Sequence, residues 1–178
     1  MADQQTTPQP SARAAPQLDR RQIEAAVARL RTEQNLTAGV LAGLAASLAG
    51  AAVWAVVTDA TGYQIGWMAV GVGFIVGVAM RALGKGIDKT FGVLGAILAL
   101  FGCILGNLLA VVGIVAQQQG ESFMSVVGRL DLSVIARLME LTFSPMDLLF
   151  YGIAIYEGYK LSFRPITQQD LTAAPAPR

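Results

Sequence analysis

The sequence predicts an all-α polytopic membrane protein with four transmembrane helices, an extracytoplasmic amphipathic helix and a cytoplasmic N-terminal helix. The chain of 178 residues is 54% hydrophobic and only 14% charged, whereas a soluble domain carries about 25% charged residues. Long uncharged runs recur along it, the clearest being 65–80 and 91–116. Lys and Arg gather on one side of these runs, which is typical of a protein with a fixed orientation in a membrane.

Two of the apolar runs form a predicted hairpin around the basic turn 81–90. A bilayer core about 30 Å thick needs roughly 20 apolar residues of helix to cross it. The run 91–116 exceeds that length, and the preceding run reaches it if Leu83 is included. Backbone amides in hydrocarbon must be hydrogen-bonded within their own segment, so both runs are predicted helices. We expect spans at about 65–83 and 91–116, with a tight polar turn at 58–64 before them.

The N-terminal region is predicted in three parts. Residues 1–16 are rich in Gln, Thr, Ala and Pro, and too few apolar groups are present to order them. Residues 17–36 form a charged cytoplasmic juxtamembrane helix with Asp19 as a plausible N-cap. This helix either binds the membrane surface or a partner, or it is a solvated stalk. The apolar run 38–57 is the first span, and it opens a membrane domain predicted over 37–164.

The segment 122–142 has a helical pattern that suits the membrane interface rather than a crossing. One face is apolar, and the opposite stripe is polar, formed by Arg129, Ser133, Arg137 and Glu140. Gly128 is expected to break the segment, and Asp131 to cap its second part. An amphipathic helix lying in the interface has this pattern. Tight packing over the mouth of the bundle would give the same pattern.

The fourth span is predicted at about 146–163. Ser144 is the expected N-cap, Pro145 takes the first helical position, and Asp147 completes a capping box. The following tail, 165–178, is rich in Pro, Ala and Gln, and we predict that it is disordered.

Basic residues predict the orientation of these spans. With four spans, eleven of the thirteen Lys and Arg residues fall on one side, and only Arg129 and Arg137 fall on the other. The positive-inside rule therefore places both termini in the cytoplasm. In the hairpin turn, we expect Arg81, Lys85 and Lys89 to contact anionic lipid headgroups.

Small residues repeat at every fourth position of the predicted spans. The clearest pairs are Gly73 with Gly77 and Gly102 with Gly106. Small residues at this spacing share one helix face and allow helices to approach closely in lipid. The rows therefore predict either a homo-oligomeric or pore-lining face, or packing between helices of the same chain.

Few residues in the chain could carry chemistry. There is no histidine and a single cysteine, which excludes zinc sites built on His or Cys and Ser-His-Asp catalysis. We therefore expect no enzyme activity, no cofactor and no metal site, and nothing resembles a nucleic-acid-binding module. Gly84-Lys-Gly86 is not a phosphate-binding loop, because the required spacing and the flanking strand are missing.

Three polar residues of the predicted spans form a candidate intramembrane site: Glu157, Lys160 and Asn107. An acid within a span is costly unless it is paired or hydrated, so Glu157 is a candidate proton or cation site. The alternative is an ion pair with Lys160, one turn along the helix. Asn107 could line the same path, or it could bond a neighbouring helix.

Three strings of the sequence resemble a family of small, uncharacterised bacterial multi-span inner-membrane proteins: residues 62–74, 84–89 and 147–160. Some members of that family carry an N-terminal zinc-ribbon. This chain has none, because its one cysteine, Cys103, lies in a predicted span. The resemblance implies a multi-pass protein of the bacterial inner membrane, and it carries no activity.

Two functions are consistent with these patterns. The first is a non-enzymatic scaffold or accessory protein that self-associates, or that organises lipids or a membrane partner. The second is a small oligomeric transporter or channel with Glu157 and Asn107 lining the path.

Overall fold

The computed structural model describes residues 20–63 and 65–172. The predicted disorder of 1–16, the predicted N-cap Asp19 and the end of the tail, 173–178, lie outside the described residues. The chain divides into two compact units. One holds the residues up to Arg29 together with those from Ile166 onward, and the other is Leu30–Pro165.

The first unit contains the start of helix α1 (Arg20–Thr32) and the short helix α8 (Gln168–Thr172). Helix α8 lies in the tail that we predicted to be disordered. Its first turn is held by a capping box, in which the Thr167 N–H donates to Asp170 Oδ2 at 2.9 Å and the Asp170 N–H donates to Thr167 Oγ1 at 3.3 Å. Thr-x-x-Asp is a sequence signal for a helix start, and it was overlooked in the Pro-rich tail.

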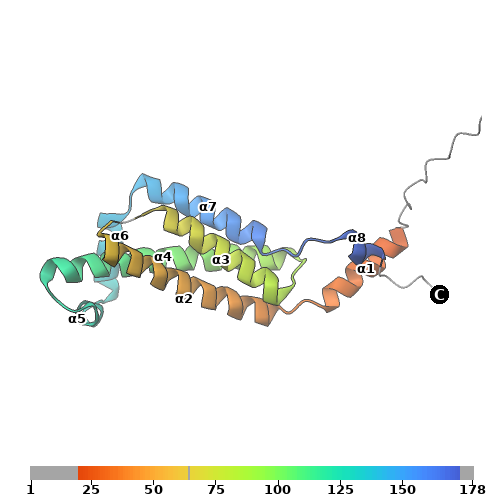
Figure 1. Cartoon of the computed structure of the whole chain (residues 1–178), viewed down its shortest axis with the longest axis horizontal. Helices are drawn as coiled ribbons and strands as arrows, with labels where there is room; N and C mark the ends of the chain where they lie inside the picture. Colours follow the sequence, from red (N-terminus) through yellow and green to blue (C-terminus); the bar gives the residue numbers. More distant parts are fainter. Residues whose placement is uncertain (1–19, 64, 173–178) are drawn as a thin grey trace, which may run out of the picture. The chain divides into compact units, whose positions relative to one another are not determined.

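The second unit is a bundle of long helices (Figure 1). Three of them are long and apolar enough to cross a membrane: α2 (Leu36–Thr61), α3 (Trp67–Gly84) and α4 (Lys89–Gln119). A further helix, α7 (Pro145–Leu161), packs against α3 and α4. The described residues are mostly helical and contain no strand.

Glycines set where two of the long helices end. The Gly62 N–H donates to the Thr58 carbonyl at 2.8 Å, and its φ of 69° closes α2 in the left-handed conformation. Gly120 closes α4 in the same way, with φ 65°. The predicted polar turn at 58–64 is therefore wrong in its first part, because α2 continues through Thr61. Glycine tolerates the left-handed conformation and allows the preceding residues to stay helical.

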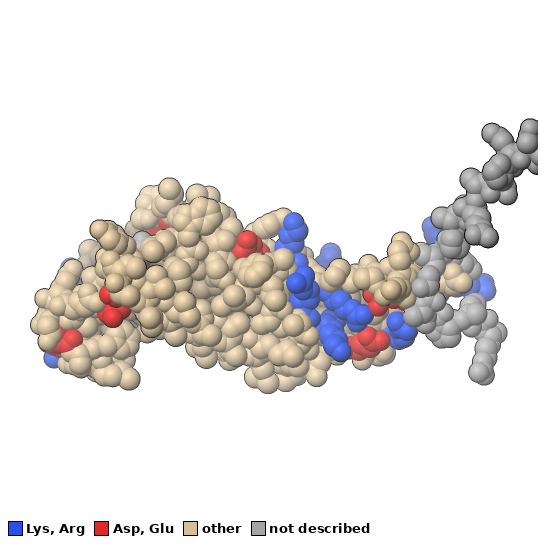
Figure 2. Space-filling model, viewed as in Figure 1, with Lys and Arg blue, Asp and Glu red and all other residues tan. Residues whose placement is uncertain are grey.

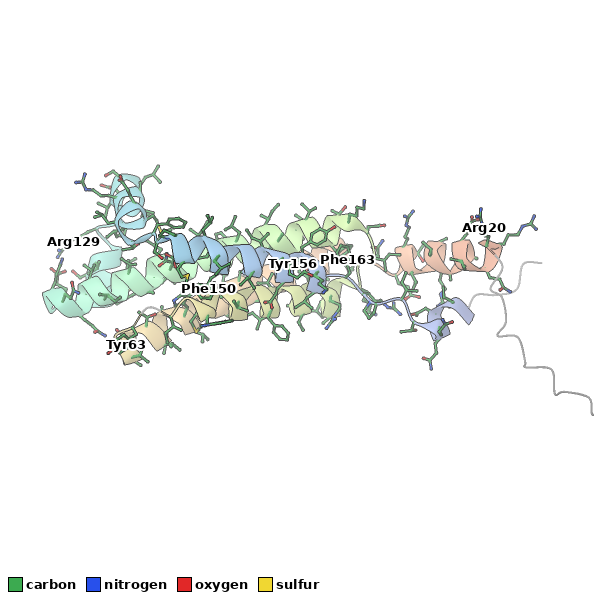
Figure 3. All side chains as sticks on the ribbon, turned by 90° about the horizontal axis from the view of Figure 1, so that it is seen from above. Arg20, Tyr63, Arg129, Phe150, Tyr156 and Phe163 are labelled. Carbon is green, nitrogen blue, oxygen red and sulfur yellow. The ribbon has the colours of Figure 1, made fainter. Side chains whose placement is uncertain are left out.

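The caps predicted after the third span are confirmed. Ser144 and Asp147 form both bonds of a capping box at the start of α7. Gly128 ends the short helix α5 (Phe123–Val127), and the Val134 N–H donates to Asp131 Oδ1 at 2.8 Å to start α6 (Leu132–Thr142). Helices α6 and α7 meet at an angle of 104°, so α6 turns across the end of the bundle (Figure 3).

The predicted small-residue rows pack helices of the same chain. A Cβ atom on Gly73 would lie 2.5 Å from the Ala154 carbonyl oxygen of α7, and one on Gly77 would lie 2.6 Å from Leu161 Cβ. On α4, Gly102 faces Ser47 of α2, and Gly106 faces the Trp54 ring. Ser47 strengthens this contact by donating to the Leu98 carbonyl at 2.8 Å.

Candidate functional site

Asn107 lies completely buried at the centre of the bundle, where α4 meets α7. The Tyr151 hydroxyl of α7 donates to the Cys103 carbonyl of α4 at 3.5 Å and lies beside the Asn107 side chain. The surrounding core is apolar and includes Val72, Val76 and Ala154. Asn107 therefore lies in the contact between two helices of the bundle, and a hydrogen bond between them there runs from Tyr151 to Cys103.

Glu157 and Lys160 do not pair. The Lys160 ammonium lies 5.3 Å from the centroid of the Tyr156 ring, which is the distance of a cation–π contact. Within the part of the chain that the structure describes, no ion pair joins Lys160 to Glu157. The ion pair that was the alternative for Glu157 is therefore not seen among the described side chains, because the Lys160 ammonium contacts Tyr156, four residues before it on the same helix face.

Glu157 is half-buried, and its backbone packs beside α3. Its backbone carbonyl would lie 3.0 Å from a Cβ on Gly77. One carboxylate oxygen, Oε2, is shielded and accepts no hydrogen bond from the described residues. The next residue, Gly158, packs on the carbonyl of Gly95, which lies six residues into α4, or about 9 Å from Lys89 at 1.5 Å per residue. Glu157 therefore lies deeper in the bundle than the basic loop between α3 and α4.

Glu157 and Asn107 are at different levels of the bundle. Tyr151, which contacts Asn107, precedes Glu157 by six residues, or about 9 Å along α7. Between the two levels lie the contacts of Gly73 with Ala154 and of Gly158 with Ala99. These contacts are close and apolar, so the three residues of the predicted site do not come together.

One end of the bundle is basic, and we call it the basic end; it carries Arg31, Arg81, Lys85, Lys89, Lys160 and Arg164. Figure 2 shows Lys and Arg gathered beside a long surface that is mostly tan and carries few charged residues. Arg81 lies in the last turn of α3, and Lys85 caps that helix with a φ of 50°. Lys89 is the first residue of α4. The three predicted lipid-contacting residues thus lie at one level.

A network that sequence reasoning missed ties the connecting segments of the basic end together. Gln34 Oε1 accepts the backbone N–H groups of Ile87 at 2.8 Å and Asp88 at 3.1 Å. Its amide nitrogen donates to Asp88 Oδ2 at 2.8 Å. The Arg164 N–H donates to the Gly86 carbonyl at 2.8 Å. Three segments far apart in sequence are therefore bonded to one another.

Phe91 explains the two glycines of the basic loop. Its ring would overlap a Cβ atom on Gly86, and it would lie 2.6 Å from one on Gly84. The ring also lies 3.2 Å from the corresponding position of Gly39 at the start of α2. The glycines are therefore required by aromatic packing, which is a sufficient reason for the Gly-Lys-Gly spacing without a bound phosphate.

The opposite end of the bundle is rich in carboxylates, and we call it the acidic end; it carries Asp59, Glu121, Asp131, Glu140 and Asp147, together with Arg129 and Arg137. In Figure 3, Tyr63 and Arg129 mark this end and Phe163 lies toward the other. Glu121 accepts from Ser125 Oγ at 2.9 Å and pairs with Arg129 at 2.9 Å. These two partners lower the pKa of Glu121.

Cavities with mostly apolar linings open on the surface of the bundle, including the following three. The first, of about 360 Å³, lies between α2 and α4 near Asp59. The second, of about 380 Å³, lies between α4 and the α5–α6 segment. The third, of about 270 Å³, lies between α2 and α3. Within the described ranges, no group of three or more Cys, Asp and Glu side chains is placed to hold a metal ion.

Comparisons with family models, with curated proteins and with solved structures find no match to this chain.

Proposed function

We propose that the chain is a four-span, non-enzymatic protein of the bacterial inner membrane that organises lipids or a membrane partner. The fourth span is α7. Its contacts with α3 run in the same direction along both helices, from Gly66 with Phe150, through Gly73 with Ala154, to Gly77 with Leu161. A helix that lies along a membrane span over this length crosses the same bilayer.

The charges support an orientation with both termini in the cytoplasm. The loop between α3 and α4 and the residues after α7 are basic, whereas the opposite end carries most of the carboxylates of the bundle. Positive loops are retained in the cytoplasm. In this orientation, α6 lies at the extracytoplasmic surface, and its residues are all at least partly exposed. Its apolar side chains, such as Leu132 at 82% exposure, would rest in lipid.

One observation favours the scaffold function over transport: among the described residues, the interior between Asn107 and Glu157 is filled by close contacts such as those of Gly73 with Ala154 and of Gly158 with Ala99. The small-residue faces that make these contacts are thus packed within the chain. The cavities instead open on the outer surface. A second copy or a partner would therefore use the outer faces, such as the α2 surface with Leu41 and Val56.

Transport by an oligomer is the second candidate, and it is favoured by the Glu157 carboxylate. An ionised carboxylate with a shielded oxygen at this depth is unfavourable in free energy unless a neighbouring residue, a water molecule or an ion binds it. The Glu157→Gln substitution in a proteoliposome flux assay separates the two functions. Flux that depends on Glu157 would support transport, and absence of flux from the unchanged protein would remove it.

Crosslinking in native membranes tests the scaffold function. We expect a reproducible oligomer or membrane partner, crosslinked through the outer faces of the bundle. Recovery of monomers alone would contradict this function. Reporter fusions test the orientation independently, and a fusion in the Gly84–Asp88 loop that reports an extracytoplasmic position would reject the orientation with both termini in the cytoplasm.

A further inference from the structure

An apolar groove lies beside the contact between α2 and α4 at the acidic end. Its volume of about 360 Å³ falls within the range of roughly 300–1,000 Å³ that is usual for ligand sites. Small side chains make room for it: Ala52 and Ala55 from α2 and Gly113 from α4, with Phe123 of α5 completing the lining. From Ala52 to Asp59 the groove follows seven residues of α2, or about 10 Å.

The groove is amphipathic along its length, because Asp59 is the one charged residue of its described lining. Asp59 lies in the last turn of α2, so its carboxylate is at the water-facing end of the groove, and the apolar part extends into the bundle. Such a site matches a molecule with a polar head and a hydrocarbon chain.

Gln117 of α4 holds the Asp59 carboxylate in place. Its amide nitrogen donates to Asp59 Oδ1 at 2.6 Å and to the Asp59 backbone carbonyl at 2.9 Å. The second carboxylate oxygen, Oδ2, receives no donor from the described residues, and no described Lys or Arg pairs with Asp59. Arg129, a cation of the same end, is paired with Glu121. The carboxylate is therefore fixed in position and has an oxygen left to bind a cation.

We propose that this groove binds an aminophospholipid, phosphatidylethanolamine, with an acyl chain along the α2–α4 groove and the ammonium group on Asp59. A primary ammonium offers three donors to carboxylate oxygens. An anionic headgroup without an amine would place like charges together at the same position. This inference rests on the proposed function, because it requires α2 and α4 to cross a bilayer.

Photolabelling in liposomes tests the site. The full chain is reconstituted with traces of phosphatidylethanolamine or phosphatidylglycerol that carry the same photoactivatable acyl chain, and the labelled residues are mapped by mass spectrometry. We expect phosphatidylethanolamine to label residues 52–59 and 109–113 about two- to fivefold more than phosphatidylglycerol does, the range for a partly exposed ion pair. Asp59→Asn should remove this preference, whereas Glu140→Gln, an exposed acid of the same end, should keep it.

A second pair of variants tests the groove itself. Ala55→Phe should fill it and reduce labelling of 109–113 by both lipids, whereas Ala45→Phe on the exposed surface of α2 should not. Equal labelling by the two lipids in the unchanged protein would overturn the headgroup assignment. Labelling spread evenly along the outer face of α2 would overturn the groove. If the reporter fusions show the expected orientation, either of these labelling results would reject the lipid site alone. The proposed function would not be affected.

Discussion

The two ends of the bundle are held together in different ways. At the basic end, hydrogen bonds join segments more than 50 residues apart, as between Gln34 and Asp88. At the acidic end, the bonds of α5, α6 and the start of α7 are local, as between Asp131 and Val134 or Ser144 and Asp147. The contact of Gln117 with Asp59 is the long-range bond that fixes the ends of α2 and α4 there.

The difference shows what each end depends on. The basic end is stabilised by protein contacts and should keep its structure in detergent. At the acidic end, none of the residues of α6 is buried by protein, and Leu141 remains 75% exposed. Apolar surface of this extent is stable when lipid covers it. We therefore expect substitutions to be costly at the basic end and mild at the acidic end.

The largest expected difference between the two ends is the change in stability when a glycine at each end is replaced by alanine. Gly86→Ala would place a methyl group within the Phe91 ring and should destabilise the bundle by about 1–3 kcal/mol, because the loop and ring must move apart. Gly128→Ala at the acidic end meets its nearest atom, the Met124 carbonyl oxygen, at 3.4 Å and should change stability by less than about 0.5 kcal/mol. Denaturant titration in detergent measures both. Equal losses would contradict the difference between the ends.

Removing the Gln34 side chain should loosen the basic loop locally. Gln34→Ala leaves the amides of Ile87 and Asp88 without their acceptor, at a cost of roughly 1 kcal/mol. Amide hydrogen exchange at these two positions should then be about fivefold faster.

The control for this change is Gln118→Ala, an exposed glutamine near the end of α4. It should leave exchange in the basic loop unchanged. Unaltered exchange at Ile87 and Asp88 in Gln34→Ala would show that the loop is held by the Phe91 contacts alone.

Local signals made most of the fold predictable. Long apolar runs located the three helices that are long and apolar enough to cross a membrane. Short motifs located the starts of α6 and α7 at Asp131 and Ser144. The end of α2 was misplaced because the polar residues from Thr58 looked like a turn, although Gly62 was the better signal. Thr167 and Asp170 were overlooked in the same way, since composition outweighed a cap.

Contacts between distant segments were not predictable in the same way. A row such as Gly73 and Gly77 looks identical whether it packs against the same chain or against a second copy. Small residues indicate only that another helix approaches closely, and they do not identify that helix. The Asn107–Tyr151 contact and the Gln34–Asp88 network depend on how the helices align. Lys160 could reach Glu157 or Tyr156, and spacing alone did not decide between them.

The position of α6 can be sharpened by thiol accessibility in liposomes. Leu141→Cys should react slowly with a membrane-impermeant reagent, because lipid covers the apolar side of an interfacial helix. Arg137→Cys, on the predicted polar stripe, should react rapidly. The native Cys103 is buried and should not contribute. Rapid reaction at both positions would show that lipid does not cover α6.

The smallest expected effect is a pH dependence confined to the acidic end. Ser125 and Arg129 lower the pKa of Glu121 below its ordinary value of 4.5. A depressed carboxyl pKa stabilises the fold above the unfolded-state value, and this contribution is lost as the pH falls through the folded-state pKa. Below about pH 4, the link from Glu121 to Arg129 should therefore weaken, and the start of α5 should loosen. NMR titration of the Glu121 carboxyl in micelles measures the shift, and Arg129→Gln should move the pKa back toward its ordinary value. A Glu121 pKa above 4.5 in the unchanged protein would show that Ser125 and Arg129 do not stabilise the ionised Glu121 carboxylate at the start of α5.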